Sequence, residues 1–311
     1  MSNLLRIGTR GSQLALWQAN WIKEQLIRRH PDLDVEIHTI KTTGDKILDV
    51  PLAKVGGKGL FVKEIEEALL RNSVDLAVHS MKDVPTELPE GLGIVAVSER
   101  EDPRDAVLGR EATPILELPE GAKIGTSSLR RQAQLFAARP DFVIEPLRGN
   151  INTRLRKLKE GMYDAIILAM AGVTRLGWEE EVTEIIDTGL MLPAIGQGAL
   201  GIEARLDDAD TLERIAFLND EVTGSCVAAE RAFLHRLEGG CQVPIAAYGV
   251  REGDEVVLTG LVGSVDGKKI VKDSDRGPAG DAAALGTALA DRILDAGGRA
   301  ILEEVYCREM N

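Results

Sequence analysis

The chain has 311 residues, 44% hydrophobic and 28% charged, a composition typical of a globular protein with room for two or three domains. Its formal net charge of −13 argues against nucleic acid or an anionic membrane as a partner of the whole chain. The sequence contains no apolar run of about 18 residues, and its start lacks the features of a secretory signal, so we expect a cytoplasmic protein.

The first third of the chain alternates short apolar segments with amphipathic ones. This pattern predicts strands at 5–10, 34–43, 75–84 and 92–99 and helices at 12–30 and 63–74. Strands separated by helices are typical of a βαβ-type lobe with a largely parallel sheet.

The same alternation restarts at residue 122 and continues to 177, which predicts a second α/β lobe. An extended segment at 200–205 is expected to return to the first sheet. We therefore predict that the chain crosses between the lobes twice, near 99–104 and near 192–198. Two doubly wound lobes joined in this way resemble the type II periplasmic binding proteins, a likeness of fold that does not settle function.

A third region begins with a helix at 225–238, continues with strands at 245–253, 255–264 and 268–273, and ends with a helix at 281–298. Strands joined by glycine-containing turns predict a small α+β domain with an antiparallel three-stranded sheet. We expect domain 1 to comprise 1–99 and 195–218, domain 2 to comprise 100–194, and domain 3 to comprise 219–311.

Two glycine-rich segments resemble nucleotide-binding motifs only superficially. "GQGALG" at 196–201 fits the dinucleotide fingerprint in spelling, but the segment after it is predicted to be extended, where the fingerprint requires a helix. "VGGKGLF" at 55–61 has Gly59 where a phosphate loop needs Ser or Thr. We interpret its surroundings as a loop that brings Lys54 and Lys58 over a site, with a plain surface loop as the alternative.

Basic residues are concentrated in one part of this acidic chain. Residues 121–160 contain nine basic side chains and three acidic ones. Within this region "IGTSSLRRQAQL" places Ser127, Ser128, Arg130 and Arg131 where a strand gives way to a helix, and such a turn can bind an anion. The simpler alternative is that Thr126 or Ser127 only caps the helix, a role that is compatible with anion binding.

Similar groups occur at other strand ends. "IGTRGSQLALWQ" repeats the strand-to-helix design with Arg10 and Ser12, and further arginines follow in the second lobe at Arg148, Arg154 and Arg175. These residues favour a polyanionic ligand over a solvated helix face.

The segment "VHSMKDVPT" ends a predicted strand at Lys82 and Asp83. Such strand ends are where α/β folds place ligand chemistry, although the pair could be a surface ion pair of little energetic value. A lone carboxylate in a cationic site stays ionised and can offset positive charge that develops on a substrate. We expect His79, in the same strand, to be a hydrogen-bonded core residue.

The three cysteines, Cys226, Cys241 and Cys307, are too widely spaced for a zinc site and too few for a disulfide framework, and we expect no metal. Cys226 and Cys307 are interpreted as buried hydrophobes. Cys241 follows two glycines at the end of a predicted helix in "LEGGCQVP". The negative pole of a helix disfavours a thiolate, so any activation of Cys241 must come from tertiary neighbours.

Taken together, the motifs resemble the porphobilinogen deaminase family from end to end. The matching segments are "IGTRGSQLAL", "GGKGLFVKEIE", "VHSMKDVPT", "GTSSLRRQAQL", "RGNINTRLRKL", "LPAIGQGALGIE" and "ERAFLHRLEGGCQVPIAAY". The resemblance implies a monomeric transferase that joins four porphobilinogen molecules head to tail with release of ammonia, yielding linear hydroxymethylbilane for tetrapyrrole biosynthesis. It also implies a dipyrromethane cofactor bound to Cys241 through a thioether.

The resemblance further implies a role for each matching residue. Asp83 would be catalytic, assisting departure of the amine and proton transfer and stabilising the azafulvene cation. The acetate and propionate groups of the cofactor would be bound by Lys82, Ser128, Arg130 and Arg131, and those of the substrate by Arg10, Ser12, Arg148, Arg154 and Arg175.

Two other functions also fit part of the sequence. A non-catalytic anion sensor would explain the arginines but gives Asp83 and Cys241 no use. A nucleic-acid binder would need aromatic residues among the basic ones, and only Phe136 and Phe142 lie there.

Overall fold

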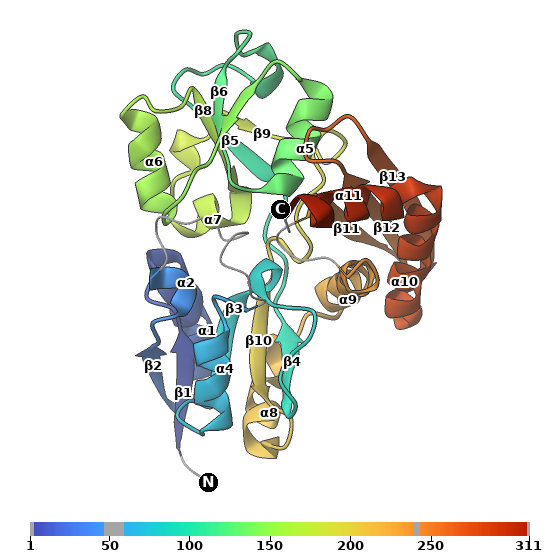
Figure 1. The fold of residues 1–311 in the computed structure, drawn as a ribbon. Helices are drawn as coiled ribbons and strands as arrows, with labels where there is room; N and C mark the ends of the chain where they lie inside the picture. Colours follow the sequence, from blue (N-terminus) through green and yellow to red (C-terminus); the bar gives the residue numbers. More distant parts are fainter. Residues whose placement is uncertain (1–2, 47–58, 239–242, 310–311) are drawn as a thin grey trace. The chain divides into compact units, whose positions relative to one another are not determined.

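The computed structural model describes residues 3–46, 59–238 and 243–309 (Figure 1). The chain divides into two compact units, one formed by 1–101 with 199–224 and the other by 102–198 with 225–311. Among the residues described, none of the helices has the length and apolar character needed to cross a membrane.

The first unit is built on a five-stranded sheet in the order β2-β1-β3-β10-β4. Strand β1 pairs in parallel with both β2 and β3, whereas β10 runs antiparallel to β3 and β4. The sheet is therefore mixed, not largely parallel as predicted. Its strands are β1 (Leu4–Thr9), β2 (Asp34–Thr39), β3 (Leu76–Ser80), β4 (Leu92–Val97) and β10 (Leu200–Arg205).

Helices cover both faces of this sheet. Helix α1 (Gln13–Arg29) packs Ile22 and Leu26 against Leu5 and Ile7 of β1. On the opposite face, α4 (Lys63–Leu70) packs Ile65 and Leu69 with residues of β3 and β4. Burial of these apolar side chains is the main favourable term that holds the helices to the sheet. The shorter helices are α2 (Thr43–Lys46) and α8 (Ala209–Ile215).

The second unit contains a five-stranded sheet of the same plan, in the order β7-β6-β8-β5-β9. Strand β6 pairs in parallel with β7 and β8, and β5 runs antiparallel to β8 and β9. The strands are β5 (Asp105–Gly109), β6 (Lys123–Gly125), β7 (Val143–Glu145), β8 (Ala165–Ala169) and β9 (Glu184–Ile185), with helices α5 (Leu129–Ala138), α6 (Ile151–Lys159) and α7 (Met170–Arg175).

In each sheet the strand at the fourth position of the order, β10 or β5, runs antiparallel to its neighbours. Strand β5 begins four residues after the first unit boundary at Glu101, and β10 begins two residues after Gly198, where the chain returns to the first unit. A strand that enters a sheet directly from a crossing segment needs no βα connection, so it is free to pair antiparallel. The expected return of residues 200–205 to the first sheet is confirmed.

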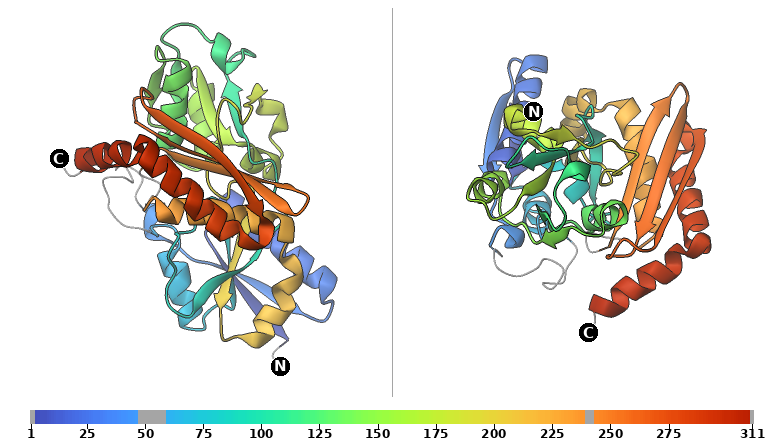
Figure 2. Two further views of the ribbon diagram at one scale, coloured as in Figure 1. Left: turned by 90° about the vertical axis from the view of Figure 1, so that its right-hand side faces the viewer. Right: turned by 90° about the horizontal axis from the view of Figure 1, so that it is seen from above.

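The second unit also contains an antiparallel three-stranded sheet, formed by β11 (Ile245–Glu252), β12 (Glu255–Gly263) and β13 (Ile270–Pro278). Helix α9 (Glu221–Arg236) places Phe233 in one core with Leu258 of β12 and Leu289 of α10 (Ala282–Ile293). Figure 2 shows α10 lying along this sheet. The predicted small α+β region is confirmed, and α11 (Arg299–Glu309) extends it beyond the last expected helix. The predicted bounds of three separate domains stay a prediction.

Close approach of α10 to α9 depends on a glycine. A Cβ added at Gly286 would lie 2.1 Å from the carbonyl oxygen of Ala229, whereas one added at the exposed Gly280 would meet nothing within 4 Å. We expect Gly286→Ala to force the helices apart and to lower the free energy of unfolding by about 1–3 kcal/mol. Gly280→Ala is the matched control, and urea unfolding followed by circular dichroism measures both. Equal stability of the two variants would contradict this account of the packing.

Candidate functional site

Chemistry-bearing residues of the first unit follow the carboxyl ends of two neighbouring parallel strands. Arg10 and Ser12 follow β1, and Lys82 and Asp83 lie in the short 3-10 helix Met81–Asp83 that follows β3. Because β1 and β3 are paired in parallel, these residues lie at one edge of the sheet. Asp83 is exposed and Lys82 is half-buried, so the carboxylate at this edge is accessible to solvent.

Arg10 is held in place by groups around it. Its guanidinium pairs with Asp45 at 2.5 Å and lies 4.2 Å from the centroid of the Phe61 ring. Burial would raise the pKa of Asp45, but hydrogen bonds from Arg10 and Thr42 outweigh burial and lower the pKa below its ordinary value. The arginine is therefore positioned by a carboxylate that stays ionised.

Ser12 and Ser80 tie helix α1 to the sheet edge. The Ser12 hydroxyl accepts a hydrogen bond from the Ala15 amide at 3.2 Å and caps α1. The buried Gln18 side chain donates to the Ser80 hydroxyl at 2.9 Å, next to the segment that contains Asp83. The Ser12 cap fixes where α1 begins, and the Gln18 contact fixes the helix relative to the end of β3.

A buried cluster of titratable groups lies behind this edge. His79 Nε2 is 2.8 Å from Glu203 Oε2, and both side chains are buried, so the prediction of a hydrogen-bonded core histidine is confirmed. Glu66 of α4 is 8% exposed. Burial, followed by repulsion from Glu203, raises the pKa of Glu66 to about 7, although His79 acts in the opposite direction.

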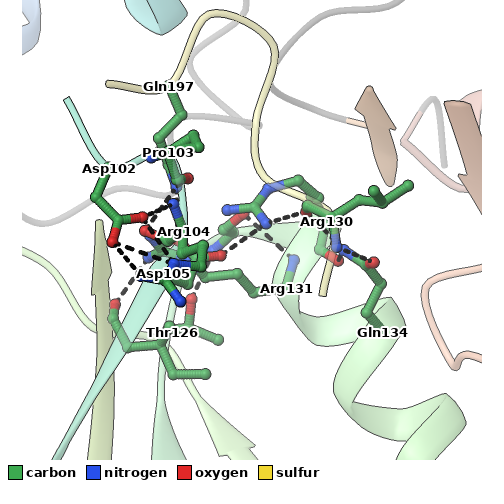
Figure 3. Close-up of polar contacts among 12 residues, drawn as sticks. Asp102, Pro103, Arg104, Asp105, Thr126, Arg130, Arg131, Gln134 and Gln197 are labelled. Carbon is green, nitrogen blue, oxygen red and sulfur yellow. Dashed lines mark hydrogen bonds and ion pairs between the residues drawn. The ribbon is translucent and has the colours of Figure 1, made fainter. Parts of the chain in front are cut away.

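In the second unit, a single carboxylate binds two adjacent arginines of α5 (Figure 3). Asp105 Oδ2 accepts a hydrogen bond from Arg130 Nη1 at 2.8 Å, and Oδ1 accepts one from Arg131 Nη2 at 2.7 Å. Asp105 is 0% exposed, Arg130 5% and Arg131 6%. We call these three residues the arginine–aspartate centre.

Backbone and amide groups complete the arginine–aspartate centre. Arg130 Nη1 also donates to the Leu192 carbonyl at 2.6 Å, and Arg131 Nη1 donates to the Ile167 carbonyl at 2.8 Å. Gln197 Nε2 donates to Asp105 Oδ1 at 2.9 Å and to the Pro103 carbonyl at 2.7 Å. The centre therefore connects α5 to two of the three places where the chain passes between the units, near Pro103 and near Gln197.

The electrostatics of the arginine–aspartate centre leave it cationic. Burial would raise the pKa of Asp105, but the charges and hydrogen bonds of both arginines outweigh burial and hold the pKa far below its ordinary value. One ionised carboxylate between two guanidiniums leaves a net charge of +1 in a buried place. The Nε atoms of Arg130 and Arg131 are buried without a hydrogen-bond partner. Such unpaired donors are rare in proteins and mark a place where an acceptor is missing.

The other predicted anion-binding residues of this unit occupy similar turns. Ser128 caps α5 and accepts from the Arg131 amide at 3.4 Å, so a hydroxyl does cap this helix, but the cap is Ser128 and not Thr126 or Ser127 as predicted. Arg154 lies in the first turn of α6 and donates through Nε to the Gly149 carbonyl at 2.9 Å. Arg175, buried at the end of α7, donates to the Gly198 carbonyl at 2.6 Å. Arg148 lies just before α6 and is half-buried.

Most of the basic side chains in residues 121–160 have acidic partners that lie outside their own helical turn. Arg156 pairs with Glu160 four residues away, whereas the partners of Lys159, Lys123 and Arg139 are Glu181, Glu145 and Asp141. With Arg130 and Arg131, six of the nine basic residues form ion pairs within the described part of the chain. The cationic character of this region is therefore weaker than the sequence suggests.

Three predicted site residues, Lys54, Lys58 and Cys241, lie outside the described residues. Cys226 is buried, as expected. Cys307 is exposed, so its interpretation as a buried hydrophobe is wrong: it lies on α11, whose core-facing positions are Ile301, Leu302 and Val305. Within the described ranges, no group of three or more His, Cys, Asp or Glu side chains could hold a metal ion.

Sequence reasoning missed Asp105 and the role of Gln197. Asp105 lies in a charged segment, "SEREDPRDAVLG", which was interpreted only as a crossing. Gln197 lies in "GQGALG", where β10 rather than a helix follows, so the rejection of a dinucleotide fingerprint is confirmed. The available signal was an acidic residue two positions after Pro103, at the predicted crossing.

The fold and these sites define an α/β protein of two lobes and a third, antiparallel sheet, with arginines and hydroxyl groups at the strand ends. Residues 5–213 match the family described as porphobilinogen deaminase, dipyromethane cofactor binding domain, and residues 225–295 match the porphobilinogen deaminase C-terminal domain. The chain therefore belongs to the porphobilinogen deaminase family, transferases of tetrapyrrole biosynthesis.

Curated relatives agree with this assignment. The porphobilinogen deaminase of Trichlorobacter lovleyi is 64% identical over 306 residues, which cover 98% of each chain. That of Geobacter sulfurreducens is 61% identical and covers 99% of this chain and 97% of its own. Among solved structures, the periplasmic aliphatic sulphonate binding protein of Escherichia coli matches 76% of this chain and 71% of its own, at 16% identity and a TM-score of 0.41.

The raised pKa of Glu66 makes the stability of the first unit depend on pH. The folded chain holds this proton up to pH 7, whereas an unfolded Glu releases it near pH 4.5, so the contribution of Glu66 is present at pH 4 and is lost as the pH rises through 7. Relative to Glu66→Gln, which keeps the neutral form at every pH, we expect wild type to lose roughly 2–3 kcal/mol between pH 4.5 and 8.

Urea unfolding followed through Trp17 and Trp21, in a Trp178→Phe chain, measures this loss in the first unit. Glu67→Gln, at the half-buried neighbouring position whose side chain pairs with Arg71, is the control and should show the same pH dependence as wild type. A stability difference between wild type and Glu66→Gln that stays constant with pH would contradict the assignment.

Proposed function

We propose that this chain catalyses the stepwise head-to-tail condensation of four porphobilinogen molecules into linear hydroxymethylbilane, primed on a covalently bound dipyrromethane. Each step joins a pyrrole carbon to the aminomethyl carbon of the next unit and releases ammonia. A final hydrolysis breaks the bond to the primer and frees the linear product, and water supplies its hydroxyl group. Membership of the porphobilinogen deaminase family supports this reaction, and the family description names the cofactor.

The observation that best supports the proposal is the arginine–aspartate centre. Every pyrrole unit of such a chain has two carboxylate side groups, and carboxylates gathered in one place repel one another unless each is paired. Arg130 and Arg131 offer a net positive charge and two buried Nε–H donors that lack an acceptor. A carboxylate of dipyrromethane supplies both the missing charge and the missing acceptor, so the residues present fit the cofactor.

We assign the remaining site residues as the family resemblance implies. Cys241 would hold dipyrromethane through a thioether, and Lys82, Ser128, Arg130 and Arg131 would pair with its carboxylates. When bound, the cofactor supplies the pyrrole ring to which new units are added. Arg10, Ser12, Arg148, Arg154 and Arg175 would bind the carboxylates of the substrate, and Lys54 and Lys58 would lie in a loop over the site. Guanidiniums suit this task because they pair with carboxylates in a bidentate manner.

Asp83 has a different task from the basic residues. Loss of ammonia leaves positive charge on the substrate carbon, and arginines nearby would destabilise that charge. The Asp83 carboxylate, exposed at the end of β3, would offset it and would accept the proton that the pyrrole ring releases when the new bond forms. A cytoplasmic location and a monomeric state stay predictions.

Replacement of the tether separates cofactor attachment from folding. We expect Cys241→Ala to give a folded chain that has no covalent pyrrole and no turnover. Mass spectrometry of the denatured chain and its colour with acidic Ehrlich's reagent measure attachment, and Cys226→Ala is the control that should keep the added mass. Covalent pyrrole on the Cys241→Ala chain would show that another residue is the tether.

Replacement of the carboxylate tests the catalytic role directly. We expect Asp83→Asn to keep its covalent cofactor but to lose turnover by roughly 100-fold or more, because the charge and the proton acceptor are both removed. Product formation from porphobilinogen measures the loss. Asp207→Asn, which neutralises an exposed aspartate elsewhere in the first unit, should retain wild-type turnover. Near wild-type turnover of Asp83→Asn would contradict the catalytic role assigned to Asp83.

A further inference from the structure

The arginine–aspartate centre has an unusual count of charges. Two guanidiniums, each less than 7% exposed, share one carboxylate that is 0% exposed. A buried charge without a partner is costly, because the interior replaces water poorly around an ion. The centre is therefore one negative charge short of neutrality.

The hydrogen bonds of Asp105 show how its carboxylate is used. It binds Arg130 and Arg131 only through their terminal nitrogens, at 2.8 and 2.7 Å, and its Oδ1 is held by Gln197 at 2.9 Å. The Nε–H groups of both arginines are left without acceptors. Asp105 thus binds the Nη atoms of the two arginines and leaves their Nε–H groups as donors for a second acceptor.

We propose that Asp105 is a positioning residue that sets the Arg130–Arg131 pair to receive a single carboxylate group of the pyrrole cofactor. The proposal rests on the function proposed above and specifies how many ligand carboxylates the pair binds. Asp105 cancels one of the two positive charges, and one ligand carboxylate cancels the other. Without Asp105 the pair has a charge of +2 and requires two anions to become neutral.

The charge count is tested in chains that cannot attach the cofactor. In a Cys241→Ala background, acetate serves as the probe for a single carboxylate, at constant ionic strength against chloride. We expect Asp105→Asn to lower Tm in chloride by at least about 5 °C, since removal of one partner of a buried ion pair is strongly destabilising. Acetate should raise the Tm of Asp105→Asn more steeply than that of the parent chain.

A double variant separates charge from packing. Asp105→Asn combined with Arg130→Gln returns the net charge of the centre to +1, so its Tm in chloride and its response to acetate should lie closer to the parent values than those of Asp105→Asn. Asp102→Asn is the matched control, because Asp102 pairs with the partly exposed Arg104 and lies three residues away. A double variant no more stable than Asp105→Asn, or an acetate response that is the same in all chains, would overturn the proposal.

Chains that keep Cys241 give an independent measurement. We expect Asp105→Asn to contain covalent pyrrole on a smaller fraction of molecules than wild type and Asp102→Asn, as measured by intact mass. Equal loading of Asp105→Asn and wild type would count against the positioning role. Absence of covalent pyrrole from wild type would instead contradict the proposed function. The acetate comparison would still test whether the arginine–aspartate centre is one negative charge short of neutrality.

Discussion

The buried carboxylate of Asp105 holds several segments of the second unit together. Its two oxygens bind helix α5 through Arg130 and Arg131, and Gln197 connects the same carboxylate to the backbone at Pro103. A charge taken out of water is tolerated only when its hydrogen bonds are satisfied by fixed partners. The start of β5, the start of α5 and the segment before β10 are therefore constrained together, and the first and last of these lie where the chain passes from one unit to the other.

The repeated plan of the two five-stranded sheets explains why ligand-binding groups are found at corresponding turns. In each sheet the second strand in order, β1 or β6, has Gly-Thr at or directly after its end, and a serine then caps the following helix. Arg10 follows β1, and Arg130 and Arg131 follow the cap of α5. The helix N-terminus contributes amide groups and a favourable dipole for anions at both turns. The difference lies in the counter-charge: Arg10 pairs with the partly exposed Asp45, whereas Arg130 and Arg131 share the fully buried Asp105.

Local features of the site could be predicted from the sequence, and distant pairings could not. The caps at Ser12 and Ser128 and the strand end before Lys82 depend on residues a few positions apart, so the motif itself determines them. Asp105 is 25 and 26 residues from its arginines and 92 from Gln197, and no periodic pattern connects such positions. The antiparallel pairing of β5 and β10 escaped prediction for the same reason, since strand direction is set by the partner strand. Cys307 was misplaced because the helix that contains it was not foreseen after Gly298.

Most basic side chains in residues 121–160 of the second unit form ion pairs with particular carboxylates and do not make up one extended positive surface. Four of the basic side chains in residues 121–160 form ion pairs with Asp141, Glu145, Glu160 and Glu181, and exposed pairs of this kind are further screened by salt. The arginine–aspartate centre is buried, so its remaining positive charge is screened far less and acts over a short distance in a fixed direction. On the proposed function, recognition of a carboxylate there would depend on the difference between two arginines and one aspartate, and a change of one charge would alter it more than the loss of a surface lysine.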